Sequence, residues 1–254
     1  MRLLEAESVS FSRPGRGELL SGISLSLEAG RIIAILGANG AGKTSLLSIL
    51  AGRLQPGRGK VRIEGTELGS LSPREIARKL AFLPQIERLP FNYSVLDFVL
   101  LGRAPHIPAF SLPGKRDYEA ARRALEEVGV AGLEDRGAAA LSGGEFQLVR
   151  IARCLAQEAE ILLLDEPTSL LDPAHAASVA LQLSLLAKRG RAILFTTHDI
   201  GLVHSVADWA LLLHEGKVLA SGPTDRPFDL TTLKKAFGAD FSLQSLPSAY
   251  SLKS

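Results

Sequence analysis

The segment that most constrains this chain is residues 37–44, which read GANGAGKT. A short apolar, β-branched run at residues 31–36 precedes it and is typical of a buried parallel strand, and residues 44–50 have helical character. Glycines between a strand and a helix let successive backbone N–H groups turn toward phosphate oxygens, and the helix N-terminus adds the positive end of its dipole. Lys43 brings a full positive charge and Thr44 brings a hydroxyl for Mg²⁺. A glycine-rich turn with a chance lysine is disfavoured, because four defined positions fall where a phosphate loop must stand.

A second pattern, an apolar strand that ends in two carboxylates, lies at residues 161–166, which read ILLLDE. A buried strand places Asp165 at its C-terminal end, where α/β sheets bind ligands. Asp165 can hold a magnesium ion directly or through water, and Glu166 is placed to orient or deprotonate an attacking water. Alone, the pattern would favour an ordinary strand that ends in a capping acid. Beside a phosphate loop, it favours a metal and water site.

Composition limits the function classes that fit this chain. A formal net charge of +2 over 254 residues is too near neutral to favour nucleic acid or an acidic membrane surface as a partner. The single cysteine, Cys154, excludes an internal disulfide, and its apolar periodic surroundings predict a buried structural thiol. The N-terminus does not have the pattern of a signal peptide, and no uncharged apolar stretch reaches the roughly 18 residues needed to cross a bilayer. We therefore expect any membrane role to be peripheral.

Hydrophobic periodicity divides the chain into an α/β part and a helical part. Strands are predicted at residues 23–27, 31–36, 61–64 (at a sheet edge), 80–83, 161–164 and 192–196, and a hairpin at 209–213 and 217–220. Helical periodicity occupies residues 94–102, 117–129 and 146–157, and Ser72-Pro73-Arg74-Glu75 is a capped helix start. We expect an α/β core at about residues 1–88 and 159–225, an inserted helical subdomain at about 89–158, and a tail at about 226–254 with a short helix near 232–237.

Residues 141–147 read LSGGEFQ, which resembles the LSGGQ signature of ABC ATPases. Other elements follow in the order of that family: Gln85 resembles its Q-loop glutamine, Asp172 its D-loop aspartate, and His198 its switch histidine. Alone, Gln85 would be a solvated loop residue and His198 a histidine at a strand end, but six elements in order favour the family. The resemblance spans residues 3 to 222. It implies a P-loop NTPase (RecA-like) α/β core with an antiparallel β portion and an inserted α-helical subdomain.

The resemblance also implies ATP and Mg²⁺ as the cofactor pair and gives each matched position a role. The residues implied to contact ATP are Gly37, Ala38, Asn39, Gly40, Ala41, Gly42, Lys43, Thr44, Ser45, Gln85, Phe11 and Arg13. Catalysis is assigned to Glu166, His198 and Lys43, and the metal to Thr44, Gln85 and Asp165. The family uses its signature in trans, against ATP held by another subunit. Here the signature residues are Leu141, Ser142, Gly143, Gly144 and Gln147, with Asp172 in the D-loop.

Two positions depart from the family pattern. The family stacks adenine on an aromatic residue in its first strand–turn unit, but here Arg13 stands just before Pro14, and Phe11 lies two residues earlier. The Arg13 guanidinium can stack on the base, and Phe11 is otherwise a core residue. Phe146 replaces the arginine or glutamine common inside the signature, which we interpret as a packing change.

Residues 80–127 are similar to the ATPases of importers for iron chelates, haem or cobalamin, in AFLPQ, in SVLDFVLLGRAPH and in an acidic–basic helix. The similarity implies separate integral-membrane permease subunits, a head-to-tail dimer with a second copy of this chain, and a periplasmic or lipid-anchored substrate-binding protein. It also implies a peripheral location at the cytoplasmic face of the inner membrane. Phe91 and Tyr93, beside Pro90, are expected to be exposed and to dock on the permease, and Phe98 to be buried. No nucleic acid is expected as a partner.

Two other classes of ABC protein stay open at this point. One is a soluble ATPase that acts on nucleic acid or ribosomes, and the other is a scaffold in iron–sulphur assembly. The first class typically carries long coiled-coil insertions, zinc cysteines or tandem ATPase units, and the sequence has none of these patterns. The importer-like stretch argues against the second. Co-purification with an integral membrane protein discriminates between all three.

Overall fold

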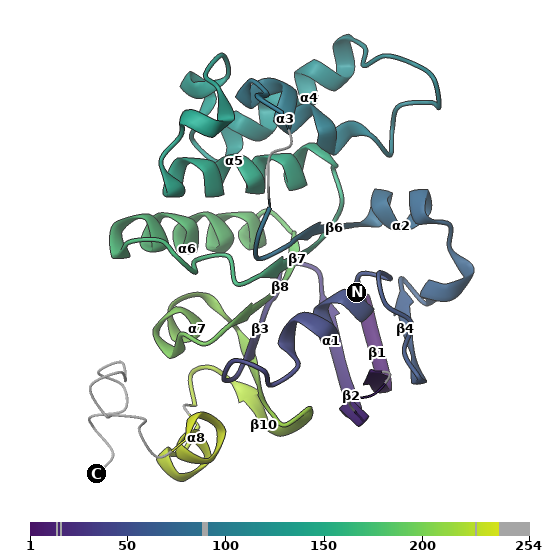
Figure 1. The fold of residues 1–254 in the computed structure, drawn as a ribbon, viewed down its shortest axis with the longest axis vertical. Coiled ribbons are helices and arrows are strands. Elements are labelled where there is room, and N and C mark those ends of the chain that lie inside the picture. The colour runs from purple at the N-terminus through teal and green to yellow at the C-terminus, as the bar shows by residue number, and fades with distance from the viewer. Residues whose placement is uncertain (14, 16, 88–90, 227, 239–254) are drawn as a thin grey trace.

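The computed structural model describes residues 1–13, 15, 17–87, 91–226 and 228–238 (Figure 1). Pro14, Pro90 and the tail beyond Gly238 lie outside the described residues. The main sheet has six strands in the order β10–β9–β3–β8–β7–β6. They are β3 (Ile32–Leu36), β6 (Leu80–Leu83), β7 (Ile161–Asp165), β8 (Ala192–Thr197), β9 (Trp209–His214) and β10 (Lys217–Pro223). All neighbours run parallel except β10, which joins β9 as the predicted hairpin.

The burial of the central parallel strands explains why their sequences are apolar. Every residue of β3, β7 and β8 is buried, so these strands read as continuous apolar runs rather than alternating ones. Ile33 and Ile35 face one core cluster, and Ala34 and Leu36 face the other. Because β3, β7 and β8 are parallel, their carboxyl ends meet at the same edge of the sheet.

The second sheet is antiparallel and has the order β2–β1–β4–β5. Its strands are β1 (Arg2–Arg13), β2 (Gly17–Glu28), β4 (Arg58–Ile63) and β5 (Thr66–Glu67). The predicted edge strand at residues 61–64 is therefore wrong in its placement, because β4 pairs with β1 on one side and with β5 on the other. The chain reverses at Gly65, whose φ of 79° suits glycine, and this turn brings the two-residue β5 back onto β4.

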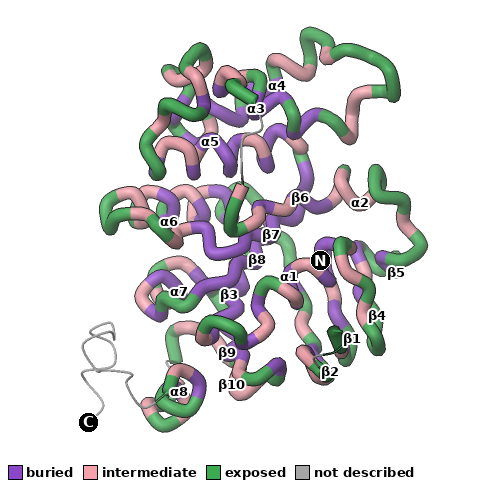
Figure 2. Tube along the Cα trace, viewed as in Figure 1, coloured by how far each residue is buried: buried purple, intermediate pink, exposed green. Residues whose placement is uncertain are grey.

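Helices fill the spaces around the two sheets (Figure 1). They are α1 (Lys43–Leu50), α2 (Pro73–Lys79), α3 (Val95–Leu100), α4 (Lys115–Glu127), α5 (Gly143–Ala156), α6 (Pro173–Lys188), α7 (Ile200–Val206) and α8 (Leu230–Phe237). Helix α1 packs between the sheets within one core cluster, and the other cluster joins the opposite face of the main sheet to α3–α8. Figure 2 shows the buried strands at the centre and exposed helix faces around them.

Helices α3, α4 and α5 lie together at one end of the molecule, within the segment predicted to be helical (Figure 1). Phe98 is buried as predicted, and Cys154 is buried as well. Ser72 caps α2 in the predicted capping box with Glu75. The structure thus has the predicted α/β class, with an antiparallel portion and a helical insertion. Within the described residues, every helix is too short or too polar to cross a bilayer.

Candidate nucleotide site

The phosphate loop joins the buried strand β3 to helix α1 at the carboxyl edge of the main sheet. Gly40 and Gly42 have φ values of 83° and 103°, which favour glycine at both positions. A side chain at Gly37 would place its Cβ 2.4 Å from the Leu213 carbonyl oxygen, so this glycine allows the loop to pass close to β9. Helix α1 begins at Lys43 without a side-chain cap. Its first N–H groups are therefore available to an anion.

Lys43 lies almost entirely inside the loop, with 6% of its surface exposed. Its Nζ donates to the carbonyl oxygens of Gly37 at 2.8 Å and Ala38 at 3.2 Å. The same Nζ lies 3.1 Å from Oε1 of Glu166. The loop thus holds its cation in place with backbone dipoles and one carboxylate.

Asp165 ends β7 and is 1% exposed. Its Oδ1 accepts hydrogen bonds from the hydroxyl of Thr44 at 3.3 Å and from the hydroxyl of Thr196 at 2.5 Å. Oxygens that share one octahedral Mg²⁺ at about 2.1 Å stand about 3.0 Å apart. The hydroxyl of Thr44 and the carboxylate of Asp165 therefore fit magnesium in both ligand type and spacing.

Glu166 stands between Lys43 and His198. Its Oε1 faces Lys43, and its Oε2 lies 2.8 Å from Nδ1 of His198. Its φ of 48° is uncommon for a residue with a side chain and costs about 1–3 kcal/mol. Hydrogen bonds hold it there, because the Glu166 N–H donates to Thr196 at 2.9 Å and the Ser169 hydroxyl donates to the Glu166 carbonyl oxygen at 2.9 Å.

A cavity of about 310 Å³ opens over these groups. Its lining consists of Arg13, Leu19, Asn39, Gly40, Gly42, Lys43, Thr44, Ser45, Gln85 and Glu166. Gln85 and Arg13, far from the loop in sequence, thus reach the same cavity. Phe11 does not belong to this lining and packs against the core between the sheets, which fits the core alternative. Ala41 is likewise buried in that core and shapes the loop from behind.

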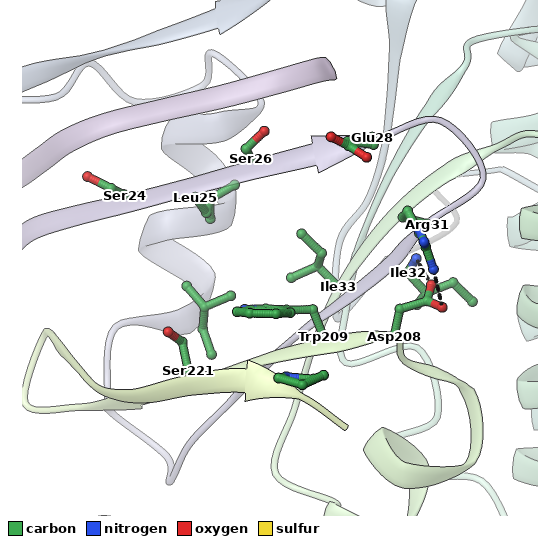
Figure 3. Close-up of a pocket in the computed structure, with 12 residues that line it drawn as sticks. Ser24, Leu25, Ser26, Glu28, Arg31, Ile32, Ile33, Asp208, Trp209 and Ser221 are labelled. Carbon is green, nitrogen blue, oxygen red and sulfur yellow. Dashed lines mark hydrogen bonds and ion pairs between the residues drawn. The ribbon is translucent and has the colours of Figure 1, made fainter. Parts of the chain in front are cut away.

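A larger cavity of about 590 Å³ lies at the opposite end of the main sheet (Figure 3). Trp209 and Ile33 line it, near the amino ends of β9 and β3, together with Leu25 of β2. Its lining includes none of the predicted site residues. The size of a cavity therefore does not locate the chemistry of this chain, whereas the loop and the carboxylates do.

The signature residues form the start of α5. Ser142 caps this helix by accepting from the Glu145 N–H at 3.3 Å, and the Glu145 carboxylate accepts from the Ser142 N–H at 2.9 Å. The Ser142 N–H and hydroxyl hold the pKa of Glu145 below its usual value. Gly143 is exposed, and Leu141 packs against the helical core. Phe146 contacts Phe98 with ring centroids 5.7 Å apart, which fits a packing change.

Gln147 does not share this surface. It is 6% exposed, and its Nε2 donates to the Pro167 carbonyl oxygen at 2.7 Å. Its Oε1 accepts from Nη1 of Arg150 at 2.7 Å. Both ends of its amide are therefore used inside the chain, and the predicted contact of Gln147 in trans is corrected to an internal tie between α5 and the segment after Glu166.

Sequence reasoning missed the charged partners of this tie. Arg150, 5% exposed, also donates to the Pro84 carbonyl oxygen and to Glu87 at 3.2 Å. Arg153 forms a second ion pair with Glu87 at 3.1 Å. The segment that carries Gln85 is thus fastened to α5. The sequence did hold one signal for this contact. Arg150 lies between Val149 and Ile151, and apolar neighbours on both sides suggest that the arginine is buried.

Comparisons with known proteins agree with this geometry. A family model described as ABC transporter matches residues 20–169. The hemin import ATP-binding protein HmuV of Pseudomonas entomophila (strain L48) is 41% identical over 250 residues, which cover 96% of each chain. The protein of the same name from Deinococcus radiodurans is 39% identical over 249 residues, covering 96% of this chain and 93% of that one.

Solved structures give the same result. A structure assigned to a metal-chelate type ABC transporter in an inward-facing conformation has a TM-score of 0.83 and 35% identity, covering 93% of this chain and 89% of that one. An ATP-binding cassette of an ABC transporter in its ADP conformation has a TM-score of 0.80 and 25% identity, covering 88% and 91%. The chain therefore belongs to the ABC transporter family and is one of its ATPase subunits.

Proposed function

We propose that this chain powers an importer for haem or a related metal chelate (an iron–siderophore complex or cobalamin) and works as a single ABC ATPase domain. The support for the cargo is the near full-length similarity to hemin import ATP-binding proteins and to a metal-chelate type transporter. The observation that carries the ATPase activity is the contact chain Lys43–Glu166–His198 beside Asp165 and Thr44.

The loop and its surroundings account for nucleotide binding. Lys43 and the uncapped start of α1 bind the β- and γ-phosphates. Arg13 borders the same cavity and stacks on the base. Thr44 and Asp165, with Gln85, would hold Mg²⁺, which when bound neutralises charge on the phosphate oxygens.

Glu166 is assigned the proton transfer. A γ-phosphate that binds Lys43 draws the ammonium from Oε1 of Glu166, and this oxygen then accepts the proton of the attacking water. His198 contacts the other oxygen, Oε2, and so fixes the direction of the carboxylate. Because its side chain is 55% exposed and contacts Glu166, His198 is also assigned to the γ-phosphate.

We further propose that the working unit is a head-to-tail dimer of C₂ symmetry. Among the described residues that line the nucleotide cavity, none belongs to the signature at 141–147. Ser142 and Gly143 are exposed at a helix N-terminus, where backbone N–H groups bind phosphate well. A second copy would supply this surface to the nucleotide of the first.

The same proposal places the chain against permease subunits at the cytoplasmic face of the membrane, with a substrate-binding protein on the other side. Ile86 and Phe91 are 70% and 69% exposed and lie close in sequence to Gln85. Exposed apolar side chains beside a group that reaches the nucleotide cavity suit a docking surface that responds to ATP. Tyr93, predicted to share this role, is half-buried and packs against the helical core.

The test is to purify the tagged chain from detergent-solubilised membranes of its own cells and to identify what accompanies it. We expect an integral membrane protein. The complex is then placed in vesicles, with haem on one side of the membrane and ATP on the other. Haem should cross the membrane only when ATP is supplied on the side that carries this chain. Recovery of the chain without a membrane protein, or bound to ribosomes or iron–sulphur assembly proteins, would overturn the proposal.

A further inference from the structure

Helix α5 meets the first turn of α6, and the residue Leu171 just before it, through its two signature glycines. A Cβ built on Gly144 would lie 1.9 Å from Cδ2, 2.2 Å from Cγ and 2.7 Å from Nε2 of His175. The imidazole ring therefore lies directly against the Gly144 backbone, in space that any side chain would need. At Gly143, by contrast, a Cβ would meet only a Leu171 methyl group at 3.9 Å, an ordinary contact.

Asp172 fixes the ring in this position. One carboxylate oxygen caps α6 and accepts from the N–H groups of Ala174 and His175, each at 3.0 Å. The other oxygen lies 2.5 Å from Nδ1 of His175. The N–H of His175, followed by its ring, holds the pKa of Asp172 below its usual value, so the carboxylate is ionised at neutral pH. The ring is thus tied to α6 at one edge and packs on α5 at the other.

This contact lies between two parts of the proposed catalytic machinery. Ser142 begins α5, and Asp172 follows Glu166 by six residues along the chain. Gln147 makes a second tie, from α5 to the Pro167 carbonyl oxygen in the segment that joins Glu166 to α6. The two contacts lie one helical turn apart, at the N-terminal end of α5 that carries the signature.

We propose that His175 is a positioning residue that sets the angle of the signature relative to the segment after Glu166, by fitting its ring into the space left by Gly144. This rests on the proposed use of Ser142 and Gly143 by a second copy of the chain. The side chain of His175 acts through α5 and does not itself touch the nucleotide of its own subunit.

The experiment is a suppression test on ATP hydrolysis by the full chain. Gly144→Ala should lower kcat by about 10²-fold, the loss that a displacement of about 1 Å in a reacting geometry causes. Its KM for ATP should change less than kcat, because Gly144 does not line the nucleotide cavity of its own subunit. Gly144→Ala/His175→Ala should recover the kcat of His175→Ala, since the smaller residue leaves room for the new methyl group.

The matched control is Gly143→Ala, whose effect should be the same with His175 or Ala at position 175. If Gly144→Ala fails to fold, the melting temperature replaces kcat as the readout. Alanine favours a helix more than glycine does, so the double variant should then melt at or above the temperature of His175→Ala. A double variant whose kcat falls below that of His175→Ala, or full activity of Gly144→Ala alone, would overturn the inference. Absence of ATP hydrolysis in the unaltered chain would instead contradict the proposed function.

Discussion

Lys43 and Glu166 form a buried ion pair, with 3.1 Å between Nζ and Oε1 and with 6% and 7% of their side chains exposed. The cation that the phosphates need and the carboxylate that the water needs are therefore partners of each other. A phosphate that enters the loop competes with Glu166 for Lys43. On the proposed roles of Lys43 and Glu166, phosphate binding and the release of the carboxylate would be one event, which would tie proton transfer to the presence of substrate.

Replacing Lys43 by alanine should abolish ATP hydrolysis and strongly weaken ATP binding, because the loop then lacks its cation. Hydrolysis is measured as phosphate release, and binding by calorimetry. The control is Lys60→Ala, which removes an exposed lysine paired with Glu67 at 3.0 Å and should leave both quantities unchanged. Unchanged steady-state hydrolysis in Lys43→Ala would contradict the assignment.

Replacing Glu166 by glutamine should separate binding from chemistry. The change keeps the shape and the contact to His198 but removes the base, so the rate should fall by about 10²–10⁴-fold. ATP binding should survive, and a dimer with trapped ATP should accumulate. Gel filtration with ATP and Mg²⁺ measures this, and elution as a monomer alone would count against the prediction.

The elements that the sequence predicted are those whose signal is local. The phosphate loop, the strand Leu80–Leu83 and the Ser72 capping box depend on neighbouring residues, and the structure has all three. Strand β1 was not predicted because Leu3 and Leu4 are both buried and its pairing with β2 shifts register. Both features break the alternation of apolar and polar residues that indicates a strand. Helix α6 was not predicted because its exposed face also carries apolar residues, such as Leu181, which leaves only a weak polar face.

The contacts that sequence could not predict are those between distant segments. The pairing of Glu87 with Arg150 spans 63 residues, and the fit of His175 against Gly144 depends on how two helices meet. The resemblance to the signature gave Gln147 a contact in trans, because neither its burial nor its bond to the Pro167 carbonyl oxygen follows from the motif. Long-range geometry, and not motif content, decides such roles.

Arg103 should be a main stabiliser of the helical subdomain. It is buried and donates to Asp117 at 3.2 Å, to the Ala156 carbonyl oxygen at 2.6 Å and to Glu158 at 2.8 Å. Arg103→Met leaves these acceptors without their donor and should lower the free energy of unfolding by about 3 kcal/mol. The control is Arg123→Met, because Arg123 is exposed and pairs with the same Glu158 at 3.4 Å, so its loss should cost at most about 1 kcal/mol.

Urea unfolding measures the stability of both variants, and equal effects would show that burial does not decide how much each arginine contributes to stability.

Unfolding by acid gives a second readout for the same cluster. The Gly114 N–H, and after it Arg103, hold the pKa of Asp117 below its usual range. The stability that this ionised carboxylate contributes is complete above pH 3.8, its ordinary pKa, and is lost as the pH falls through the lower folded-state value.

Cys154 should resist thiol reagents in the folded chain. Burial raises the pKa of its thiol from 9.0 to about 11, so at pH 8 the reactive thiolate is scarce as well as covered. The stability gained by keeping this thiol neutral is complete below pH 9.0 and is lost as the pH rises toward 11. Mass spectrometry after iodoacetamide treatment should find Cys154 modified only in urea. Rapid modification at pH 8 without urea would contradict the burial of the Cys154 thiol. Because the thiol has a structural role, Cys154→Ala should keep ATPase activity.

The surface that couples ATP hydrolysis to the permease should lie at Ile86 and Phe91. These residues follow Gln85 by one and six positions and are 70% and 69% exposed. Tyr93 is excluded from the test because its ring packs on the helical core, so its removal would disturb the fold. Replacing Ile86 and Phe91 by alanine removes apolar surface that is mostly exposed in the isolated subunit, although the Phe91 ring also meets Tyr93 edge-on with 5.8 Å between centroids. The double variant should therefore fold and hydrolyse ATP at the normal rate, yet lose transport in vesicles that contain the permease. Leu181→Ala, an equally apolar change at a 59% exposed position on α6, is the control and should retain transport. ATPase rate and haem uptake are measured side by side, and normal uptake in the double variant would place the coupling surface elsewhere on the chain.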